Sequence, residues 1–370
     1  MGWYTSRAKP PSSGPIIIVP TVEVGFFPLD RRLRLVRHSW SPATIKNAVE
    51  VAIQIPSYAR AATSLQGLTR IPLSRSSLQQ LTCEYGERLV ALQESEAEAM
   101  VRLPAGVSEG EVWRAIAEPD SAQMAVAMDG GMVNIRGEGW KEAKIVAVSA
   151  VKTREEGSAE PVVKLTRTSY RAGLWEAARF ANQQWAEGCR RGLEKAQRVV
   201  CVSDGAAWIW AIVAMCYAPR CIEILDWWHA VQKLWELAFA LWNQEEQHSH
   251  AWAEEQKALL WAGNLRQLCR ELRRLCPRGE PLPDKIRLAL GYLFHHRWRM
   301  RYAQFRQAGC PIGSGSVEAG CKVVVQERMK QAGMRWSRAG AQAMLALRSI
   351  LLSERWQEVW PTLAPVPKLA

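Results

Sequence analysis

The sequence lacks the features that most readily identify membrane, secreted and zinc-finger proteins. It has no uninterrupted run of about 18 uncharged apolar residues, the length that a membrane-spanning helix needs. Its first residues contain no apolar signal-peptide core. It has nine cysteines but no Cys-x-x-Cys pair, so a structural zinc site is not expected. These absences predict a reduced, cytoplasmic protein with buried thiols and no membrane partner.

Two further shortages narrow the functional class. The glycine-rich loop that begins at Gly313 is not followed by Gly-Lys-Ser or Gly-Lys-Thr, which excludes a P-loop kinase or ATPase. Acidic residues are in the minority, 36 against 48 Lys and Arg, and the formal net charge is +12. Such an excess favours a polyanionic partner, most often nucleic acid, although basic enzymes without such a partner exist.

Apolar runs that end in an acid are the most informative feature present. Residues 199–202 are apolar and β-branched in character, and they lead through a serine to Asp204. Residues 124–128 lead in the same way to Asp129, and a third short run ends at Asp226. Buried strands have this composition, and acids at their carboxyl ends lie in the crevice where open α/β sheets bind ligands. We therefore expect Asp129 and Asp204 at strand ends, sharing a carboxylate-based metal site.

The order of the expected elements indicates an α/β fold. Three antiparallel strands are followed by a helix, a strand, a second helix and a final strand. Their expected ranges are 124–129, 141–148, 162–170, 174–195, 199–204, 206–215 and 221–226. This is the element order of a ribonuclease H-like α/β/α core.

Composition and punctuation divide the 370 residues into segments. Residues 1–40, rich in Pro, Gly and Arg, predict an extended basic arm. Residues 41–103 predict a small helical domain compatible with a helix-turn-helix DNA reader, although three-helix packing without DNA is the simpler interpretation. The remaining segments are the first part of the core at 121–228, a helical insertion at 229–308, the C-terminal helices of the core at 309–355, and a tail at 356–370.

A third acid, Glu318, follows the glycine-rich loop. Ser314 or Ser316 is expected to cap its helix, and Glu318 then lies in the first turn, where the helix dipole favours a carboxylate. Capping is the simpler role for this residue taken alone. The order Asp129, Asp204, Glu318, on two strands and a helix, favours a shared catalytic site.

Several motifs together resemble bacterial insertion-sequence transposases of the DDE type, of the ISKra group. The matching stretches are Gly25-Phe26-Phe27-Pro28-Leu29-Asp30, Met128-Asp129-Gly130, Trp140-Lys141-Glu142, residues 203–210, Asp226-Trp227-Trp228-His229, and residues 312–322. The resemblance implies a ribonuclease H-like catalytic domain interrupted by a helical insertion. Members carry a Cys-containing zinc-ribbon-like segment ahead of the first motif. Here residues 12–24 contain no Cys, so the sequence departs from that pattern.

The resemblance also implies an activity and a set of site residues. The acid triad maps onto Asp129, Asp204 and Glu318, and the Asp-x-x-His element, similar to one in mutator-type transposases, maps onto Asp226 and His229. The expected enzyme cuts and joins transposon ends with two Mg²⁺ (or Mn²⁺) ions, since Mg²⁺ prefers carboxylate oxygens. Its expected partners are double-stranded transposon-end and target DNA, bound by a homodimer in the bacterial cytoplasm, associated with the nucleoid. The alternatives are a ribonuclease H-like nuclease without strand transfer and a domesticated DNA-binding derivative.

Basic and aromatic residues near these acids are candidate DNA contacts. The basic candidates beyond Glu318 are Lys322, Arg328, Lys330, Arg335 and Arg338. For Lys322, an ion pair with Glu318 four residues earlier is an equally good role. His229 can orient Asp226, contact a phosphate or fill a helix start. Tryptophans 208, 210, 227 and 228 can stack on bases, although buried packing is the better expectation for most of them.

Overall fold

The computed structural model describes residues 40–101, 116–154, 160–242, 246–275 and 281–364. The expected N-terminal arm lies outside these ranges apart from residue 40, and so does the end of the tail beyond residue 364. Among the described residues, no helix combines the length and apolar character needed to cross a membrane.

A five-stranded mixed sheet, ordered β3-β2-β1-β4-β5, forms the centre of the molecule. Its strands are β1 (Gln123–Ile135), β2 (Gly139–Arg154), β3 (Val162–Gly173), β4 (Arg198–Ser203) and β5 (Cys221–Leu225). The first three strands pair antiparallel, whereas β4 runs parallel to β1 and β5 runs parallel to β4. The predicted α/β class and the predicted order of strands and helices are therefore confirmed.

The β1–β2 hairpin is longer than the sequence indicated. Its register runs from Met124 opposite Ala150 to Ile135 opposite Gly139, so β1 continues past Asp129. Near the end of β1, the amide of Trp336 donates to the carbonyl of Asn134 over 2.9 Å. This contact extends the pairing of β1 on its other edge, where β4 has already ended. Asp129 was predicted at a strand end, and this prediction is wrong because the ladder with β2 carries the strand six residues further.

Alternate residues of β1 and β2 face two different cores, as the two-residue period of a strand requires. Met124, Val126 and Met128 pack under α6 (Ala177–Arg190) and α7 (Ala207–Cys216). The opposite face of the sheet contributes to the second core through Ala127, Val133, Ala143, Ile145 and Ala147. It packs against α15 (Arg338–Leu352) and the short helices before it. The helix expected at 174–195 is shorter, and a 3-10 turn at Leu193–Lys195 follows it.

In the described part of the chain, three helices precede the sheet: α2 (Pro42–Gln54), α3 (Tyr58–Thr69) and α4 (Arg75–Val101). The hydroxyl of Ser41 accepts the amide of Thr44 over 3.2 Å and so caps the start of α2. Along α4, a stripe of side chains is buried at Leu78, Leu81, Tyr85 and Leu89. These side chains share one core with α15 and with the sheet, so the three helices are packed onto the face of the sheet that α15 covers.

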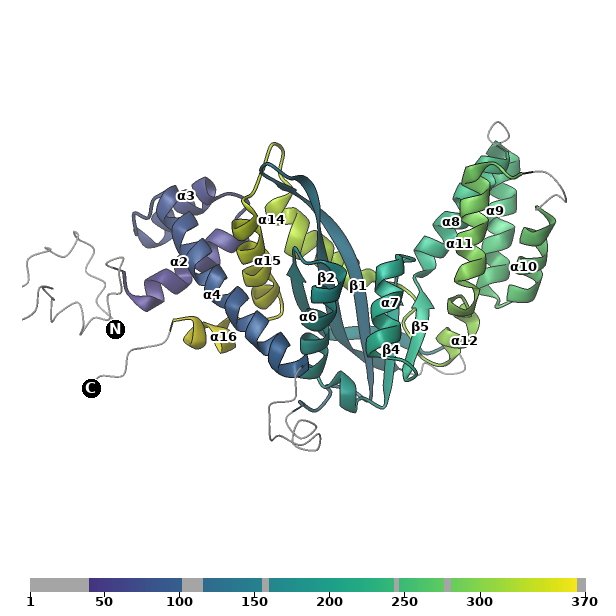
Figure 1. Cartoon of the computed structure of the whole chain (residues 1–370), viewed down its shortest axis with the longest axis horizontal. Helices are drawn as coiled ribbons and strands as arrows, with labels where there is room; N and C mark the ends of the chain where they lie inside the picture. The colour runs from purple at the N-terminus through teal and green to yellow at the C-terminus, as the bar shows by residue number, and fades with distance from the viewer. Residues whose placement is uncertain (1–39, 102–115, 155–159, 243–245, 276–280, 365–370) are drawn as a thin grey trace, which may run out of the picture.

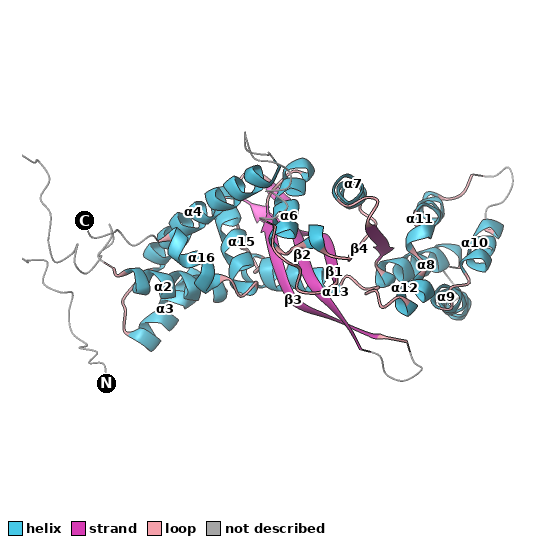
Figure 2. Cartoon of the chain, turned by 90° about the horizontal axis from the view of Figure 1, so that it is seen from below, coloured by secondary structure: helices cyan, strands magenta, loops and turns pink. Residues whose placement is uncertain are grey.

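After β5 the chain forms the expected helical insertion. Its helices are α8 (Trp227–Leu241), α9 (Glu246–Trp261), α10 (Leu265–Arg274), α11 (Asp284–His295) and α12 (Tyr302–Gln307). The chain then returns through α13 (Gly315–Gly320), a π-helical segment η3 (Cys321–Gln326), α14 (Glu327–Met329), α15 and α16 (Trp356–Leu363). Figures 1 and 2 place α2–α4 at one end of the molecule, α8–α11 at the other, and the sheet between them.

Candidate active site

The parallel register brings two acids to one level. Val126 of β1 lies opposite Cys201 of β4. Asp129 and Asp204 each come three positions later on their own strand. The hydroxyl of Ser203 accepts the amide of Met128 over 2.9 Å, which continues the alignment beyond the last paired residues. The same spacing from the paired residues therefore sets Asp129 and Asp204 side by side at the edge where β4 ends.

The next strand adds a third acid at this level. Ser203 lies opposite Leu225 of β5, so Asp204 and Asp226 are both one residue beyond that pair. The amide of Asp226 donates to the carbonyl of Ser203 over 2.9 Å. The hydroxyl of Tyr302 donates to the carbonyl of Leu225 over 2.9 Å and holds the end of β5. We call Asp129, Asp204, Asp226, His229 and Glu318 together the acidic edge.

Asp226 is fully buried and is the N-cap of α8. Its Oδ1 accepts the amide of His229 over 2.8 Å and lies 2.9 Å from His229 Nδ1. Its Oδ2 accepts the amide of Ser314 over 2.6 Å. Burial tends to raise the pKa of Asp226, but these hydrogen bonds outweigh it and the pKa is lowered. Asp226 is thus an ionised carboxylate whose two oxygens are both engaged, one of them with His229.

Glu318 reaches the same place from α13. The hydroxyl of Ser314, the N-cap residue of that helix, donates to Glu318 Oε1 over 2.6 Å. The possible ligand atoms of Asp226, His229 and Glu318 all lie within 4.8 Å of one another. The hydrogen bond to Asp226 raises the pKa of His229 against the effect of burial, and the charges of Asp204 and Glu318 raise it further. The expected ion pair between Lys322 and Glu318 does not form within the described structure.

Asp129 faces α13 and η3 from the middle of β1. Its Oδ1 accepts the amide of Gly130 over 2.7 Å, and the thiol of Cys321 donates to its Oδ2 over 3.2 Å. Burial raises the pKa of Asp129, and the nearby charge of Asp204 adds to this rise, which outweighs the two hydrogen bonds. Burial and the same carboxylate raise the pKa of the Cys321 thiol. Cys321 was not predicted here, although it lies one helical turn after Glu318 and so on the same face.

Asp204 is held by a turn that requires glycine. Its Oδ1 accepts the amide of Ala206 over 2.9 Å, and its carbonyl accepts the indole N–H of Trp210 over 2.9 Å. A β-carbon on Gly205 would lie 2.1 Å from a ring carbon of Tyr292. Burial raises the pKa of Tyr292, and the charges of Asp204 and Asp226 add to it. The insertion therefore brings a tyrosine from α11 to the acidic edge, and no sequence motif marked it.

The donor set fits hard divalent cations, because Mg²⁺ and Mn²⁺ prefer carboxylate oxygens and Mg²⁺ binds with several waters retained. Among the described residues, Asp129, Asp204 and Glu318 have no ion pair with Lys or Arg, and the nearby His229 is engaged with Asp226. The possible ligand atoms of these three acids do not form a group within 4.8 Å, as those of Asp226, His229 and Glu318 do among the described residues. Asp226 is fully buried and its Oδ1 is held by both the amide and the ring of His229, so it is suited to orient His229.

Of the five basic residues expected to contact DNA, four are exposed and one is buried. Lys322, Lys330, Arg335 and Arg338 are exposed. The guanidinium of Arg338 pairs with Glu138 at the hairpin tip.

Arg328 was predicted to contact DNA, and this prediction is wrong. Its side chain is 1% exposed and donates to the carbonyls of Ala52 and Pro56 over 3.2 and 3.1 Å. These carbonyls lie at the C-terminal end of α2, where backbone acceptors lack partners within the helix. Arg328 therefore joins the returning chain to the N-terminal helices.

The four tryptophans considered for stacking also differ. Trp210 and Trp227 are buried, and Trp208 is partly buried beside Lys144, whose ammonium lies 5.2 Å from the ring centre. Trp228 alone of the four is 65% exposed. Packing is therefore confirmed as the role of Trp210 and Trp227, and Trp228 remains open to a ligand.

No family model matches the chain, and no curated protein sequence matches it. A similar solved structure is the Drosophila P element transposase strand transfer complex. Its identity to this chain is 11%, the match covers 88% of this chain and 81% of that one, and the TM-score is 0.27. A likeness at this level carries no argument about activity. Membership of the ISKra group stays a prediction, and the function must be argued from the acidic edge itself.

Proposed function

We propose that this chain is a metal-dependent DNA transposase of the DDE type, with a ribonuclease H-like core that cuts and joins transposon ends. One observation carries the proposal. Asp129 and Asp204 lie at one level on neighbouring parallel strands, and Glu318 meets the same edge from α13, although the three acids are far apart in the chain. Acids gathered without an ion pair to Lys or Arg repel one another, and a bound cation would relieve this repulsion.

Asp129, Asp204 and Glu318 would hold two Mg²⁺ or Mn²⁺ ions. Bound there, the ions would activate the attacking oxygen and neutralise the leaving oxygen of a phosphodiester. Ser314 supports this set by fixing Glu318 with its hydroxyl and Asp226 with its amide. The thiol of Cys321 and the amide of Gly130 each donate to one oxygen of Asp129 and so orient its carboxylate.

Asp226 and His229 have a supporting role in this proposal. Asp226 engages Nδ1 of His229, which leaves Nε2 as the ring nitrogen free to reach a phosphate oxygen. Because the pKa of His229 is raised, more of the imidazole is protonated near neutral pH and can donate a charged hydrogen bond. The pair would then position the scissile phosphate beside the acids.

DNA would be bound by charge outside the acidic edge. The exposed Lys322, Lys330, Arg335 and Arg338 follow Glu318 in the chain, and the net charge of +12 supplies the wider attraction to phosphates. The guanidinium of Arg338 would have to leave Glu138 or contact DNA together with it. The proposal also includes a homodimer on DNA, which would bring two transposon ends together.

The test is cleavage of the DNA that flanks the coding region. Wild-type protein should nick a duplex carrying the terminal repeats only when Mg²⁺ or Mn²⁺ is present. Asp129→Asn and Asp204→Asn should lower the nicking rate by at least about 1,000-fold, the scale of losing a main electrostatic stabiliser, while DNA affinity is kept. Mg²⁺-dependent nicking retained in either variant would contradict the assignment.

The same reaction separates the two alternatives. Joining of the cut end to a second duplex identifies a transposase, whereas cleavage without joining identifies a nuclease. Binding without any metal-dependent cleavage identifies a DNA-binding derivative.

A further inference from the structure

A hollow rich in tryptophan adjoins the acidic edge on the side of the insertion. Its volume is about 610 Å³, within the range of roughly 300–1,000 Å³ that is usual for ligand pockets. We call it the tryptophan cavity, and its lining residues are Trp227, Trp228, Glu254, Lys257, Ala258, Trp261, Ile312 and Gly313.

The tryptophan cavity begins where the acidic edge ends. Trp227 and Trp228 follow Asp226 directly in the chain. The amide of Trp227 donates to the carbonyl of Ile312 over 3.0 Å, and a β-carbon on Gly313 would lie 3.9 Å from Asp226 Oδ2. A nucleotide whose phosphate lies at the acidic edge therefore has its own or the next base within reach of the cavity.

Two large aromatic rings at the cavity are open to solvent. Trp228 is 65% exposed and Trp261 is 45% exposed, whereas Trp227 between them is buried. Trp227 meets Trp261 edge to face, with 5.0 Å between the ring centres. Exposed tryptophans at a pocket are typical of surfaces that stack on a flat ligand.

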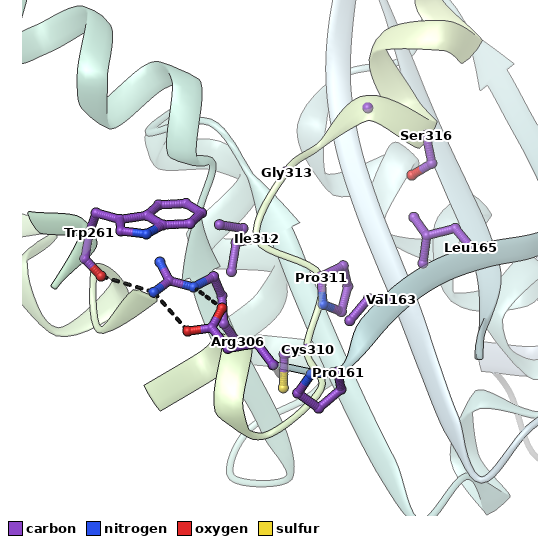
Figure 3. Close-up of a pocket in the computed structure, with 12 residues that line it drawn as sticks. Pro161, Val163, Leu165, Trp261, Arg306, Cys310, Pro311, Ile312, Gly313 and Ser316 are labelled. Carbon is purple, nitrogen blue, oxygen red and sulfur yellow. Dashed lines mark hydrogen bonds and ion pairs between the residues drawn. The ribbon is translucent and has the colours of Figure 1, made fainter. Parts of the chain in front are cut away.

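Trp261 is held in place before any ligand arrives. The guanidinium of Arg306 lies 3.5 Å from the centre of its ring, and Glu160 accepts two hydrogen bonds from Arg306, over 2.7 and 3.1 Å. Figure 3 shows Arg306 against Trp261 on one side of the loop that contains Ile312 and Gly313, with Val163 and Leu165 on the other. A ring fixed in this way loses little conformational entropy when a base stacks at the cavity.

We propose that the tryptophan cavity takes one unpaired nucleobase of the DNA strand whose phosphate lies at the acidic edge. The inference rests on the proposed function, because it is that function which brings DNA to Asp226. Glu254 and Lys257 are the only charged lining residues, and they pair with each other over 3.0 Å. The other lining side chains are apolar, so recognition is by stacking and is tolerant of base identity.

The experiment compares two oligonucleotide duplexes in EDTA, where no cleavage occurs. One carries a single unpaired adenine beside a nick, and the other carries an abasic residue at the same position. Wild-type protein should bind the first about tenfold more tightly by fluorescence anisotropy, the scale of stacking one base on an aromatic side chain. Trp228→Ala and Trp261→Ala should reduce this ratio to near one, and Trp228→Phe should restore most of it.

The matched control is Trp298→Ala, because Trp298 is 60% exposed but lies outside the cavity. It should keep the wild-type ratio. Equal wild-type affinity for both duplexes, no binding of either, or an equal loss on both duplexes in Trp228→Ala would overturn the inference. A loss of self-association in Trp228→Ala with an unchanged ratio would assign the cavity to a second copy and would also overturn it.

The inference and the proposed function fail separately. Metal-dependent cleavage with no preference for the unpaired base would remove the inference alone. A preference for the base without any cleavage would remove the proposed function alone.

Discussion

The carboxylate of Glu187 and the carboxylates of the acidic edge have opposite surroundings. Glu187 of α6 is 2% exposed, and Ser169 donates its hydroxyl to it over 2.5 Å while Arg190 donates over 3.0 Å. Burial raises the pKa of Glu187, but Arg190 and Arg171 outweigh burial and the pKa is lowered. The pKa of Asp129 is raised, because burial and Asp204 act together against weaker hydrogen bonds.

The difference separates an acid that stabilises the fold from the acids that the proposed function assigns to metal binding. Glu187 is neutralised by the protein itself, so its charge is part of the folded structure. Within the described part of the chain, the carboxylates of the acidic edge form no ion pair with Lys or Arg, and the nearby His229 is engaged with Asp226. At Glu187 the arginines provide the stabilisation that an external cation would have to provide at the acidic edge.

The largest expected effect is on stability at Glu187. Glu187→Gln leaves Arg190 without its carboxylate partner and removes a charge that attracts Arg171, and it should lower the free energy of unfolding by about 3–5 kcal/mol. Urea unfolding followed by circular dichroism measures this loss. Glu236→Gln is the control, because the Lys233–Glu236 pair is on the surface and should contribute less than about 1 kcal/mol. Equal losses in the two variants would remove the contrast between the acidic groups.

A smaller effect is expected from the support of His229. Asp226→Asn removes the charge that sets the His229 ring and should lower DNA cleavage by about 10–100-fold, as for other supporting residues in metal sites. The pH profile of cleavage should also change, because the pKa of His229 is then no longer raised by Asp226. An unchanged profile together with a lower rate would indicate a purely structural role for Asp226.

The ionised carboxylates of Glu187 and Asp129 should contribute to the free energy of unfolding with opposite signs, because one pKa is lowered and the other raised. The pKa of Glu187 is lowered in the folded protein, so its stabilisation is complete above the pKa of the unfolded glutamate. It is lost as the pH falls through the lowered folded value. The difference in urea midpoint between wild type and Glu187→Gln should therefore narrow from neutral pH towards about pH 3. A difference that widened as the pH fell would contradict the assignment.

The smallest expected effect is a gain. Asp129→Asn removes a carboxylate whose ionised form is disfavoured in the folded protein, so the metal-free variant should be slightly more stable than wild type at neutral pH. The expected rise in Tm is about 1–2 °C, the scale of a contribution below 1 kcal/mol in a chain of this size. A clear fall in Tm in metal-free buffer would show that Asp129 is a structural acid like Glu187.

The sequence predicted the parts of the site that local pattern determines. Apolar runs ending in an acid identified β4 with Asp204 and β5 with Asp226, because buried parallel strands are short and continuous in hydrophobicity. Asp129 was found by the same rule but placed at a strand end. The continuation of β1 depends on pairing with β2, which local composition does not reveal.

Other features depend on contacts between distant segments. Arg328 lies in a stretch with four exposed basic residues, and local sequence gives no sign that it binds the carbonyls of Ala52 and Pro56. These carbonyls lie 276 and 272 positions earlier in the chain. Tyr292 reaches Gly205 from the insertion, and Cys321 reaches Asp129 from η3. Such residues are identified only when the fold brings them together.

Calorimetric titration of metal-free protein with Mn²⁺ tests the central claim most directly. Wild-type protein should bind Mn²⁺ with a saturable heat, and Asp129→Asn, Asp204→Asn and Glu318→Gln should each lose most of it, while Glu187→Gln at a temperature where it is folded should keep it. Binding that is absent in wild type, or unchanged in all three variants of the acidic edge, would contradict the account.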